Sequence, residues 1–574
     1  MAEPNYWQRL SRKRLSRRAL LGVGATTALG GAAALAVGCS GGNGSSPGTT
    51  PDPNATPGPG GSITWGRPVS VGGIDPHVDL TGLDITTLLY PSLYSWAPGA
   101  ELMIFNNLAT ALEMPEVTNF IFTLREGVRN APVGGDHDGE DIDSEACKES
   151  FFRRGTSITA IDKRFPFKIA GSSDPAILRA ALLTPDKYTF SFNMAEPFVP
   201  AVREMANATY AIMSPGVVED APRLQLGQNA FGSGPFMLEE FLGNERVVLK
   251  RNPDYFIPDR PYLDGITYVI ITDNASLLAA FKNGQHDISG AILVREDFDR
   301  FDADPSISVN RAPSLFYPVV HLNVRREPFD DIRVREALNI SINRDRIIEL
   351  AQSGEGQYSG PIQWPQVKWA LPEGRLNSFY KRDVAKAKQL MEAAGYADGI
   401  RDILIKTPRL PGINFINDIA RIIVDSWKDI NVNVQIDEVE LGAYIGSVLL
   451  PGNFDMTFFP NLPYDEPDRP LSFYHSLGVT GSGNWTGYSN PTLDKLINAQ
   501  SAEFDVEARQ AIITEAQELI LEEHGPQLTT TGGYQYSATR AYVHFPFASF
   551  GFSLDANIPL DSNPFGTDIW TEMT

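Results

Sequence analysis

The chain has 574 residues, of which 42% are hydrophobic, 10% aromatic and 21% charged. This composition is typical of a globular protein with several hydrophobic cores, and the two cysteines exclude a disulfide-stapled scaffold. Asp and Glu number 70 against 48 Lys and Arg, so the net charge is -22. Such a surface repels phosphate backbones, and we expect no nucleic-acid partner.

Residues 1–38 have the layout of an export signal, because six basic residues between Arg9 and Arg18 precede an apolar run from Ala19 to Val37. The stretch SRRALL at 16–21 resembles a twin-arginine signal. AVGC at 36–39 resembles a bacterial lipobox, in which Cys39 becomes the lipidated first residue, although Leu35 lies one place upstream of the usual position. A transmembrane helix is the alternative, and the glycines and threonines of the run weaken it.

Residues 39–61 are expected to form a flexible tether. From Ser40 onward they read SGGNGSSPGTTPDPNATPGPGG, a tract without a large hydrophobic residue. A flexible chain of about 22 residues spans roughly 25 Å, which lets a lipid-anchored globule turn above a membrane. No second low-complexity break follows, so the remaining residues are expected to form connected domains.

Apolar periodicity predicts strands early in the chain and helices later. Alternation at period two predicts strands over 62–66, 119–124 and 187–192. Helical spacing predicts helices over 384–394, 419–427, 493–499 and 508–521, the first capped by Gly395. A strand over 432–436 follows the second of these helices after a short connection. This alternation is typical of the α/β class.

Catalytic and metal-binding signatures are absent from the sequence. It contains no G-x-S-x-G, H-E-x-x-H or G-x-x-x-x-G-K motif, and its seven histidines show no metal-ligand spacing. The acidic run 136–145 suggests a calcium loop, but Asp141 and Cys147 stand where the loop requires Gly and Glu. We interpret the run as a solvated turn before a helix with Ser144 as its N-cap, and Cys147 as a buried thiol. We expect no catalytic residues, no cofactor and no metal site.

The stretch GSGPF at 232–236 has two interpretations. A glycine-rich loop can cradle a phosphate, but Pro235 lacks an amide donor and no strand-to-helix context surrounds it. We therefore favour a tight turn that enters a strand.

Eight short stretches, taken in chain order, carry a family resemblance. They are FTLREGV at 122–128 with DG at 138–139 and FFRR at 151–154, GSGPF with VVLKRNPDY at 247–255, PFDDIRVREAL at 328–338, AKAKQLMEAAGY at 385–396 and GYSNPTLDKLI at 487–497. In this order they resemble the extracytoplasmic solute-binding proteins of bacterial ABC importers, in the oligopeptide, dipeptide and nickel-binding family known as family 5. Asn343 stands where that family usually has Asp.

The resemblance implies an α/β fold, a two-lobed periplasmic-binding-protein-like clamp of type II with an extra subdomain on the N-terminal lobe. By analogy, lobe I takes residues 62–270 plus 541–574, with the subdomain at about 96–200, and lobe II takes 271–540. Such a clamp closes over a solute and presents it to the permease subunits of the importer. We expect a lipid-anchored monomer on the outer face of the bacterial cytoplasmic membrane; a solute-sensing receptor component is the alternative.

The resemblance also points to ligand-binding residues. In peptide binders of this family, an Asp three residues before an acidic-Pro pair holds the peptide's α-amine, and here Pro463 occupies that position before Glu466-Pro467. Asp465 could replace it. We predict that Tyr464, Asp465, Trp485 and Tyr488 line the cleft, with buried packing as the alternative role of the last two. A peptide is the first choice of solute, and a sugar, a metal chelate or another non-peptide solute stays open.

Overall fold

A computed structural model describes most of the chain from residue 55 onward. The described ranges are 55–79, 81–97, 103–156, 164–172, 174–224, 230–290, 293–314, 317–364, 368–409, 414–461, 466–477, 483–544 and 568–572. The predicted export signal, Cys39 and most of the predicted tether lie outside these ranges. Within them, no helix has the length and apolar character needed to span a bilayer.

The first sheet has the strand order β1-β10-β9-β8. Its strands are β1 (Ser62–Arg67), β10 (Gly265–Ile270), β9 (Arg246–Arg251) and β8 (Phe236–Leu242). β1 runs parallel to β10, so their carboxyl ends, at Arg67 and Ile270, lie on one edge. Ile63 and Trp65 are buried together with side chains of helix α3 (Leu83–Leu89), which explains the period-two pattern that predicted β1.

The turn before β8 is confirmed, since the strand begins at Phe236. A Cβ atom on Gly232 would lie 1.9 Å from the carbonyl oxygen of Leu89, and one on Gly234 would lie 2.4 Å from that of Leu88. Both positions therefore require glycine because of the close approach of the α3 backbone.

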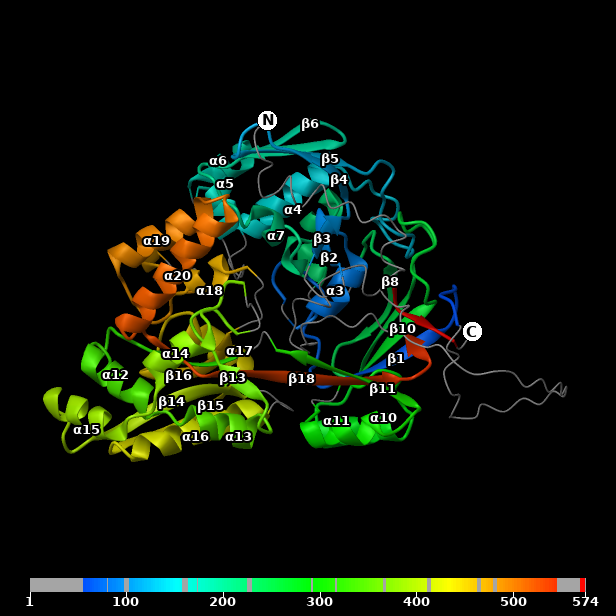
Figure 1. The fold of residues 1–574 in the computed structure, drawn as a ribbon. Coiled ribbons are helices and arrows are strands. Elements are labelled where there is room, and N and C mark those ends of the chain that lie inside the picture. Colours follow the sequence, from blue (N-terminus) through cyan, green and yellow to red (C-terminus); the bar gives the residue numbers. More distant parts are fainter. Residues whose placement is uncertain are drawn as a thin grey trace, which may run out of the picture.

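A separate four-stranded sheet, β4-β5-β7-β6, forms a subdomain above the first sheet (Figure 1). Its strands are β4 (Ala109–Glu113), β5 (Asn119–Leu124), β7 (Thr189–Asn193) and β6 (Leu182–Asp186), and the short pair β2 (Tyr94–Ala97) and β3 (Met103–Asn106) precedes them. The neighbouring helices are α4 (Ser144–Thr156), α5 (Arg164–Ala170), α6 (Pro175–Ala181), α7 (Ala201–Glu204), η1 (Ala208–Tyr210), α8 (Pro215–Glu219) and α9 (Ala221–Leu224). Stacked rings of Phe120, Phe122, Phe190 and Phe192 fill its core.

Helix α4 begins where the sequence predicted, but its cap is Asp143 and not Ser144. The Asp143 carboxylate accepts hydrogen bonds from the amides of Glu145 and Ala146. The Ser144 hydroxyl donates instead to the carbonyl of Asp186, at 2.7 Å, so it ties the helix to β6. Cys147 is fully buried one turn later, and burial raises the pKa of its thiol.

The second lobe is built on a five-stranded sheet of order β15-β14-β16-β12-β17. Its strands are β15 (Val432–Glu440), β14 (Ile400–Arg409), β16 (Met456–Asn461), β12 (Tyr317–Leu322) and β17 (Gln527–Thr529). Its helices are α12 (Ile332–Ser341), α13 (Arg344–Ala351), α14 (Glu373–Tyr380), α15 (Val384–Ala393), α16 (Asn414–Lys428), α17 (Leu441–Ala443), the π-helical turn η2 (Tyr444–Leu449), α18 (Asp468–Ser472), α19 (Pro491–Ala502) and α20 (Val506–Glu522). The helices predicted over 384–394, 419–427, 493–499 and 508–521 are thereby confirmed, and Gly395 follows α15 with φ +91°.

Strand β18 (Thr531–Arg540) connects the two lobes along the base of the molecule (Figure 1). Its first residues pair with β13 (Gly356–Tyr358), and its remainder pairs with β11 (Ile307–Pro313). Ile288 bridges Trp65 of β1 to Thr539 of β18, so β18 joins the first sheet. A shared core joins β18 to helices α10 (Asn274–Lys282) and α11 (Arg295–Asp302). Both helices come from the stretch assigned to lobe II by analogy, and the lobe limits stay a prediction.

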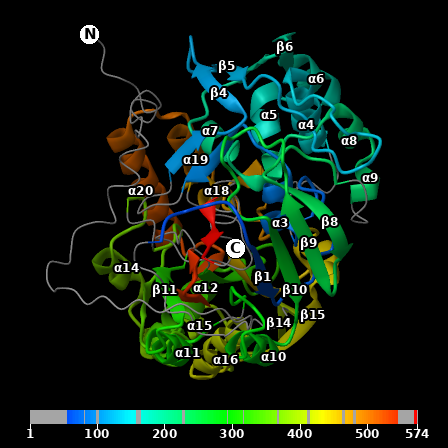
Figure 2. The same cartoon turned by 90° about the vertical axis from the view of Figure 1, so that its right-hand side faces the viewer.

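A two-stranded sheet close to the C-terminus pairs β19 (Val543–His544) with β20 (Trp570–Thr571). In Figure 2 the subdomain strands and helices gather at the top, whereas α10, α11 and α16 lie at the bottom. Helices α18, α19 and α20 of the second lobe lie beside α7 in both views, and the Val199 amide donates to the Ser501 carbonyl at 2.7 Å there.

Candidate functional site

The strand order of the second-lobe sheet reverses next to β14. The chain leaves β14 through α16 to reach β15 on one side, and then returns through α17 and η2 to β16 on the other side. All three strands are parallel, so their carboxyl ends share one edge. In α/β sheets, ligands bind outside the carboxyl ends of the strands at such a reversal. The segments 410–413 and 462–465 directly follow these ends.

Two of the predicted ligand residues, Tyr464 and Asp465, lie in the segment 462–465, outside the described residues. The residues on either side lie within the described ranges. Asn461, the last residue of β16, pairs with Tyr317 of β12. Glu466 is 5% exposed and precedes α18.

Glu466 is held by a buried polar network. Its Oε1 accepts a hydrogen bond from Arg509 Nη2 of α20. The same guanidinium donates to Gln500 Oε1 at 2.9 Å, and Gln500 Nε2 donates to Asp468 Oδ1 at 2.7 Å. Buried charges are tolerated when they are paired and hydrogen-bonded, and Arg509 is 1% exposed. This network fixes the residue that directly follows Asp465.

Glu466 also reaches the other lobe. Arg203 Nε of α7 lies 3.8 Å from Glu466 Oε2. In the chain, the predicted ligand residues are flanked by Asn461 at the carboxyl end of β16 and by Glu466, which contacts Arg203 of the other lobe. A solute held between this carboxyl edge and α7 would contact both lobes, which is the geometry that couples binding to closure.

Trp485 packs on the second-lobe sheet near the same strand. Its ring centroid lies 5.4 Å from that of Phe473, 5.9 Å from His321 and 6.3 Å from Phe459, and its side chain is partly buried. Phe459 belongs to β16, two residues before the strand ends. Trp485 thus contacts β16, the strand that precedes Tyr464 and Asp465 in the chain, and the Trp485 side chain is only partly buried.

Tyr488 is placed differently from Trp485. It is 6% exposed within the core of α19 and α20, and its hydroxyl donates to Glu523 Oε2 at 2.9 Å. Asn490 Nδ2 donates to the same oxygen at 2.8 Å. Burial raises the pKa of Tyr488. These contacts suit the packing role that the sequence left as an alternative, and the ligand role stays a prediction.

His321 was one of the scattered histidines in the sequence, and the structure puts it in contact with Trp485. Its ring is fully buried; Nε2 lies 3.3 Å from the carbonyl oxygen of Phe459, and Nδ1 has no hydrogen-bond partner among the described residues. Burial lowers the pKa of His321 to about 4, so the ring is neutral at physiological pH. The only sequence feature that could have indicated the burial of His321 was its position in the alternating stretch Tyr317–Leu322.

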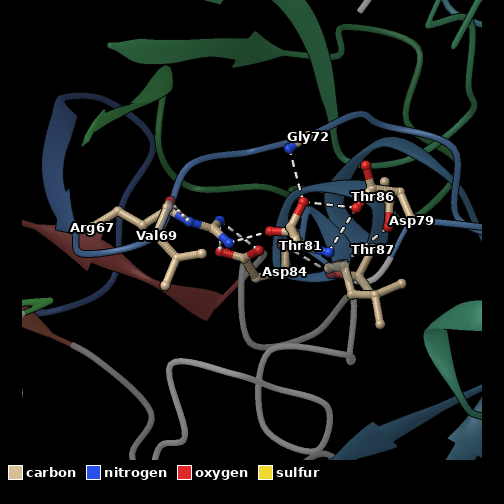
Figure 3. A network of polar contacts seen from close by, with 9 residues as sticks. Arg67, Val69, Gly72, Asp79, Thr81, Asp84, Thr86 and Thr87 are labelled. Carbon is tan, nitrogen blue, oxygen red and sulfur yellow. Dashed lines mark hydrogen bonds and ion pairs between the residues drawn. The ribbon is translucent and has the colours of Figure 1, made fainter. Parts of the chain in front are cut away.

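The first lobe presents its own strand edge through Arg67, the last residue of β1 (Figure 3). Arg67 Nη1 donates to both carboxylate oxygens of Asp84, at 2.7 and 2.6 Å, and Nε donates to the Val69 carbonyl at 3.0 Å. Nη2 donates to the carbonyl of Thr81. The Thr81 hydroxyl accepts from the amide of Gly72 at 2.8 Å. These bonds fold the chain between β1 and α3 back on itself and fix the edge.

Sequence reasoning missed Arg67 and Asp84. An arginine that directly follows a period-two strand, with an acidic residue in the first turn of the next helix, was the available signal. The Ile271 amide donates to the Arg67 carbonyl at 2.9 Å, so the ends of β1 and β10 are joined.

No group of three or more His, Cys, Asp or Glu side chains in the described ranges is arranged to hold a metal ion. In the acidic run, Asp138 accepts from the amides of Val133 and Gly134, and Asp141 pairs with Arg129 and Lys187. These carboxylates are already occupied, which agrees with the solvated turn predicted there.

Known proteins resemble this chain over most of its length. A dipeptide-binding protein of Pseudomonas aeruginosa is 24% identical over 517 residues, which cover 85% of this chain and 94% of the relative. The oligopeptide-binding protein AppA of Bacillus subtilis is 26% identical over 71% of this chain and 78% of its own.

Solved structures share the fold. The binding protein AgaA of A. tumefacien R10, in complex with agropinic acid, has a TM-score of 0.77 at 21% identity, with 90% of this chain and 99% of that chain covered. DppA of Helicobacter pylori, in complex with the peptide STSA, has a TM-score of 0.75 at 21% identity, with 89% and 98% covered. These neighbours confirm the two-lobed type II clamp that the sequence predicted.

The profile of the bacterial extracellular solute-binding proteins, family 5 (middle region) matches residues 104–484, about two thirds of the chain. The peptide-binding relatives and the binding-protein fold agree with this match. The chain therefore belongs to family 5 of the bacterial extracellular solute-binding proteins, the substrate-binding proteins of ABC importers.

Proposed function

We propose that this protein is the lipid-anchored substrate-binding component of an ABC importer that captures a peptide-like solute between its lobes and delivers it to the membrane permease. The observation that carries the proposal is that β14, β15 and β16 share one carboxyl edge, and that Glu466, just beyond this edge in the chain, contacts Arg203 of the other lobe. The peptide-binding relatives support a peptide as the solute.

Within this proposal, Asp465 provides the negative charge for the α-amine of a peptide, and Tyr464 and Trp485 provide apolar surface beside it. Pro463 stands where the family's peptide binders carry their amine-binding Asp, so Asp465 is the nearest carboxylate in the segment that can replace it. Glu466 is not a candidate, because its carboxylate is already bound to Arg509. In this proposal Tyr488, from the core of α19 and α20, would line the cleft as well.

A carboxylate that holds an ammonium group makes affinity depend on the charge of that group. Calorimetric titration with tri-alanine and with N-acetyl-tri-alanine tests this role. The wild type should bind the free peptide at least tenfold more tightly, and Asp465→Asn should remove most of that difference. Glu507→Gln, at an exposed position of α20, serves as the charge-matched control. Equal affinities of the wild type for the two peptides would reject Asp465 as the amine-binding group.

Cys39 is the proposed lipid attachment site, and the tether that follows would keep the clamp near the permease. Cys39→Ala should move the protein from the membrane fraction to the soluble exported fraction of the producing bacterium. Persistence of the variant in the membrane fraction would contradict lipid anchoring.

A non-peptide solute is the second candidate. It is favoured by Pro463, which replaces the usual amine-binding carboxylate, and by the neighbour AgaA, whose structure holds agropinic acid. Tight binding of a sugar-containing solute without binding of tri-alanine would favour this candidate.

A further inference from the structure

The turn between α19 and α20 presents Phe504 at its tip. Glu503 directly follows α19, and Asp505 caps α20 by accepting a hydrogen bond from an amide of its first turn, at 2.8 Å. The Asp505 amide donates to the Glu503 carboxylate at 2.7 Å, which closes the turn. Beneath the turn, Arg509 Nε donates to the Gln500 carbonyl at 3.0 Å and ties the two helices together. Phe504 therefore stands on a well-supported backbone.

Phe504 packs against the subdomain and not within its own lobe. Its side chain is partly buried against the hydrophobic core of the subdomain. The core that α19 and α20 form with each other, around Leu493, Ile497 and Ile513, does not include Phe504 among the described residues. A phenylalanine between two acidic neighbours is removed from water only when another part of the molecule covers it. The subdomain provides that cover here.

A backbone hydrogen bond joins the same two parts of the molecule. The Val199 amide, in the loop before α7, donates to the Ser501 carbonyl at 2.7 Å, and both residues are buried. Ser501 is the last residue but one of α19, and the final carbonyls of a helix have no partner within that helix. A buried carbonyl without a donor is costly, so the donor from the subdomain strengthens the contact.

The contact lies away from the connection between the lobes. Strand β18 joins the lobes at the base, and the chain leaves β11 beside it, because the Ser314 amide donates to the Gly533 carbonyl at 2.9 Å. Figure 1 shows α19 and α20 beside α7, well above this strand. A rotation of the lobes about the base therefore separates Phe504 from the subdomain, so the contact belongs to the closed clamp.

We propose that the turn 503–505, here called the latch, docks on the subdomain and holds the clamp closed over the captured solute. This inference rests on the proposed function. Only the closed clamp makes both the solute contacts and the latch contact, so the free energy of docking adds to the affinity for the solute. Phe504 is then a positioning residue, which strengthens binding through closure and provides no group that recognises the solute.

Two consequences distinguish a latch from a residue that contacts the solute. Loss of the latch weakens the binding of every solute by the same factor, because it changes the free energy of closure and not a particular contact. It also acts on release. The solute enters the open clamp, where the latch is undocked, and leaves only after the latch contact is broken. The association rate is therefore unchanged, and the release rate rises.

Stopped-flow tryptophan fluorescence of the purified protein with tri-alanine and with tri-leucine tests both consequences. Phe504→Ala should raise the release rates of both peptides by the same factor, about fivefold to tenfold, which corresponds to half of a buried phenylalanine. The association rates should stay within about twofold of the wild type. Phe504→Leu keeps an apolar side chain and should recover most of the loss.

Phe379→Ala is the matched control. Phe379 is also a partly buried phenylalanine of the second lobe, but it packs on a small core around α14, within that lobe. The substitution should lower the melting temperature, because core contacts are lost, and leave both rates within about twofold of the wild type. Melting temperatures of all variants, measured without peptide, show whether each is folded.

Hydrogen exchange at Val199 reports on the latch without any solute. Prolines have no amide hydrogen, so the amides of Phe198 and Val199 are the only two in the stretch 197–200. Protection of the Val199 amide reports the closed fraction, because its acceptor lies in the other lobe. Mass spectrometry of the fragment 195–205 should show protection in the wild type, faster exchange in Phe504→Ala, and wild-type exchange in the control variant.

The results that overturn the latch differ from those that reject peptide binding. If the wild type binds the peptides but shows no protection at Val199, or if folded Phe504→Ala keeps the wild-type exchange and release rates, the latch is wrong and the proposed function stands. Clearly different factors for the two peptides would also reject the latch, because Phe504 would then contact the solute. If the wild type binds neither peptide while Phe504→Ala still speeds exchange, the latch stands and the peptide-binding function fails. Neither binding nor protection would reject both.

Discussion

Arg203 and Glu466 come from different lobes, and Arg203 Nε lies 3.8 Å from Glu466 Oε2. The partners differ in burial, with side-chain exposures of 18% and 7%. Glu466 is also bound to Arg509, a buried residue of its own lobe. The contact therefore adds attraction between the lobes without leaving a buried carboxylate unpaired when the clamp opens.

Arg203→Gln should favour the open clamp and weaken solute binding. The contact is long and partly exposed, so its contribution is modest, about 0.2–1 kcal/mol, or up to roughly fivefold in affinity. Titration of the wild type and the variant with tri-alanine measures it. Arg223→Gln, which removes an exposed pair with Asp220 on one lobe, should have no effect. An unchanged affinity in Arg203→Gln would show that the contact does not stabilise closure.

Removal of the Arg509 guanidinium should destabilise the fold strongly. Arg509→Met leaves the Glu466 carboxylate buried without its main cation, which costs about 3–5 kcal/mol in buried pairs. The double variant with Glu466→Gln should recover part of this loss, because no unpaired charge remains. Urea unfolding measures both, with Arg346→Met as the control for an exposed pair, at under about 1 kcal/mol. A loss in Arg509→Met no larger than in the control would contradict the buried network.

Acid should lower the free energy of unfolding, in part because His321 becomes protonated. Its pKa is lowered to about 4 by burial, and the unfolded chain binds a proton near the ordinary value of 6.5. The unfolded state then binds more protons, so stability is fully present above pH 6.5 and is lost as the pH falls toward 4. The loss is about 3 kcal/mol.

His77 acts in the same direction, since burial and Arg153 lower its pKa to about 3. His321→Asn should make the decline of unfolding free energy between pH 6.5 and 4 shallower, by about 3 kcal/mol. Urea unfolding at a series of pH values measures the slope. A slope identical to that of the wild type would mean that His321 is protonated in the folded protein.

Gly232→Ala should destabilise the first lobe, because the new Cβ atom would lie 1.9 Å from a backbone oxygen of α3. Overpacking of this kind costs about 1–3 kcal/mol. Gly374→Ala in α14 is the contrasting control, since no atom lies within 4 Å of its Cβ position and alanine favours a helix by about 0.5–1 kcal/mol. Thermal unfolding should give a lower melting temperature for Gly232→Ala than for the wild type, and an equal or higher one for Gly374→Ala. A melting temperature of Gly232→Ala at or above that of the wild type would contradict the close approach.

Local patterns predicted much of the fold. Alternation at 62–66 and 119–124 gave β1 and β5, because each strand buries one face against a core. The cap of α4 was wrong by one residue, since Asp143 and Ser144 are both good caps and only the contact of Ser144 with Asp186 decides between them. That contact is long-range and invisible in a local pattern.

The candidate site was predictable only in part. Resemblance pointed to the segment 462–465 and to Trp485, whose ligand roles stay predictions, whereas the burial of Tyr488 in the α19–α20 core depends on tertiary packing. The arginines that meet Glu466 lie far from it in the chain, and exposed and buried arginines look alike in sequence.

Thermal-shift screening of the purified protein against di- to hexapeptides, oligosaccharides and metal chelates tests the central claim most directly. A solute that binds only the folded clamp stabilises it by about 2.7 kcal/mol at a hundredfold excess over its dissociation constant. The account predicts a clear rise in melting temperature with peptides. A rise with oligosaccharides or chelates alone, and none with any peptide, would contradict it.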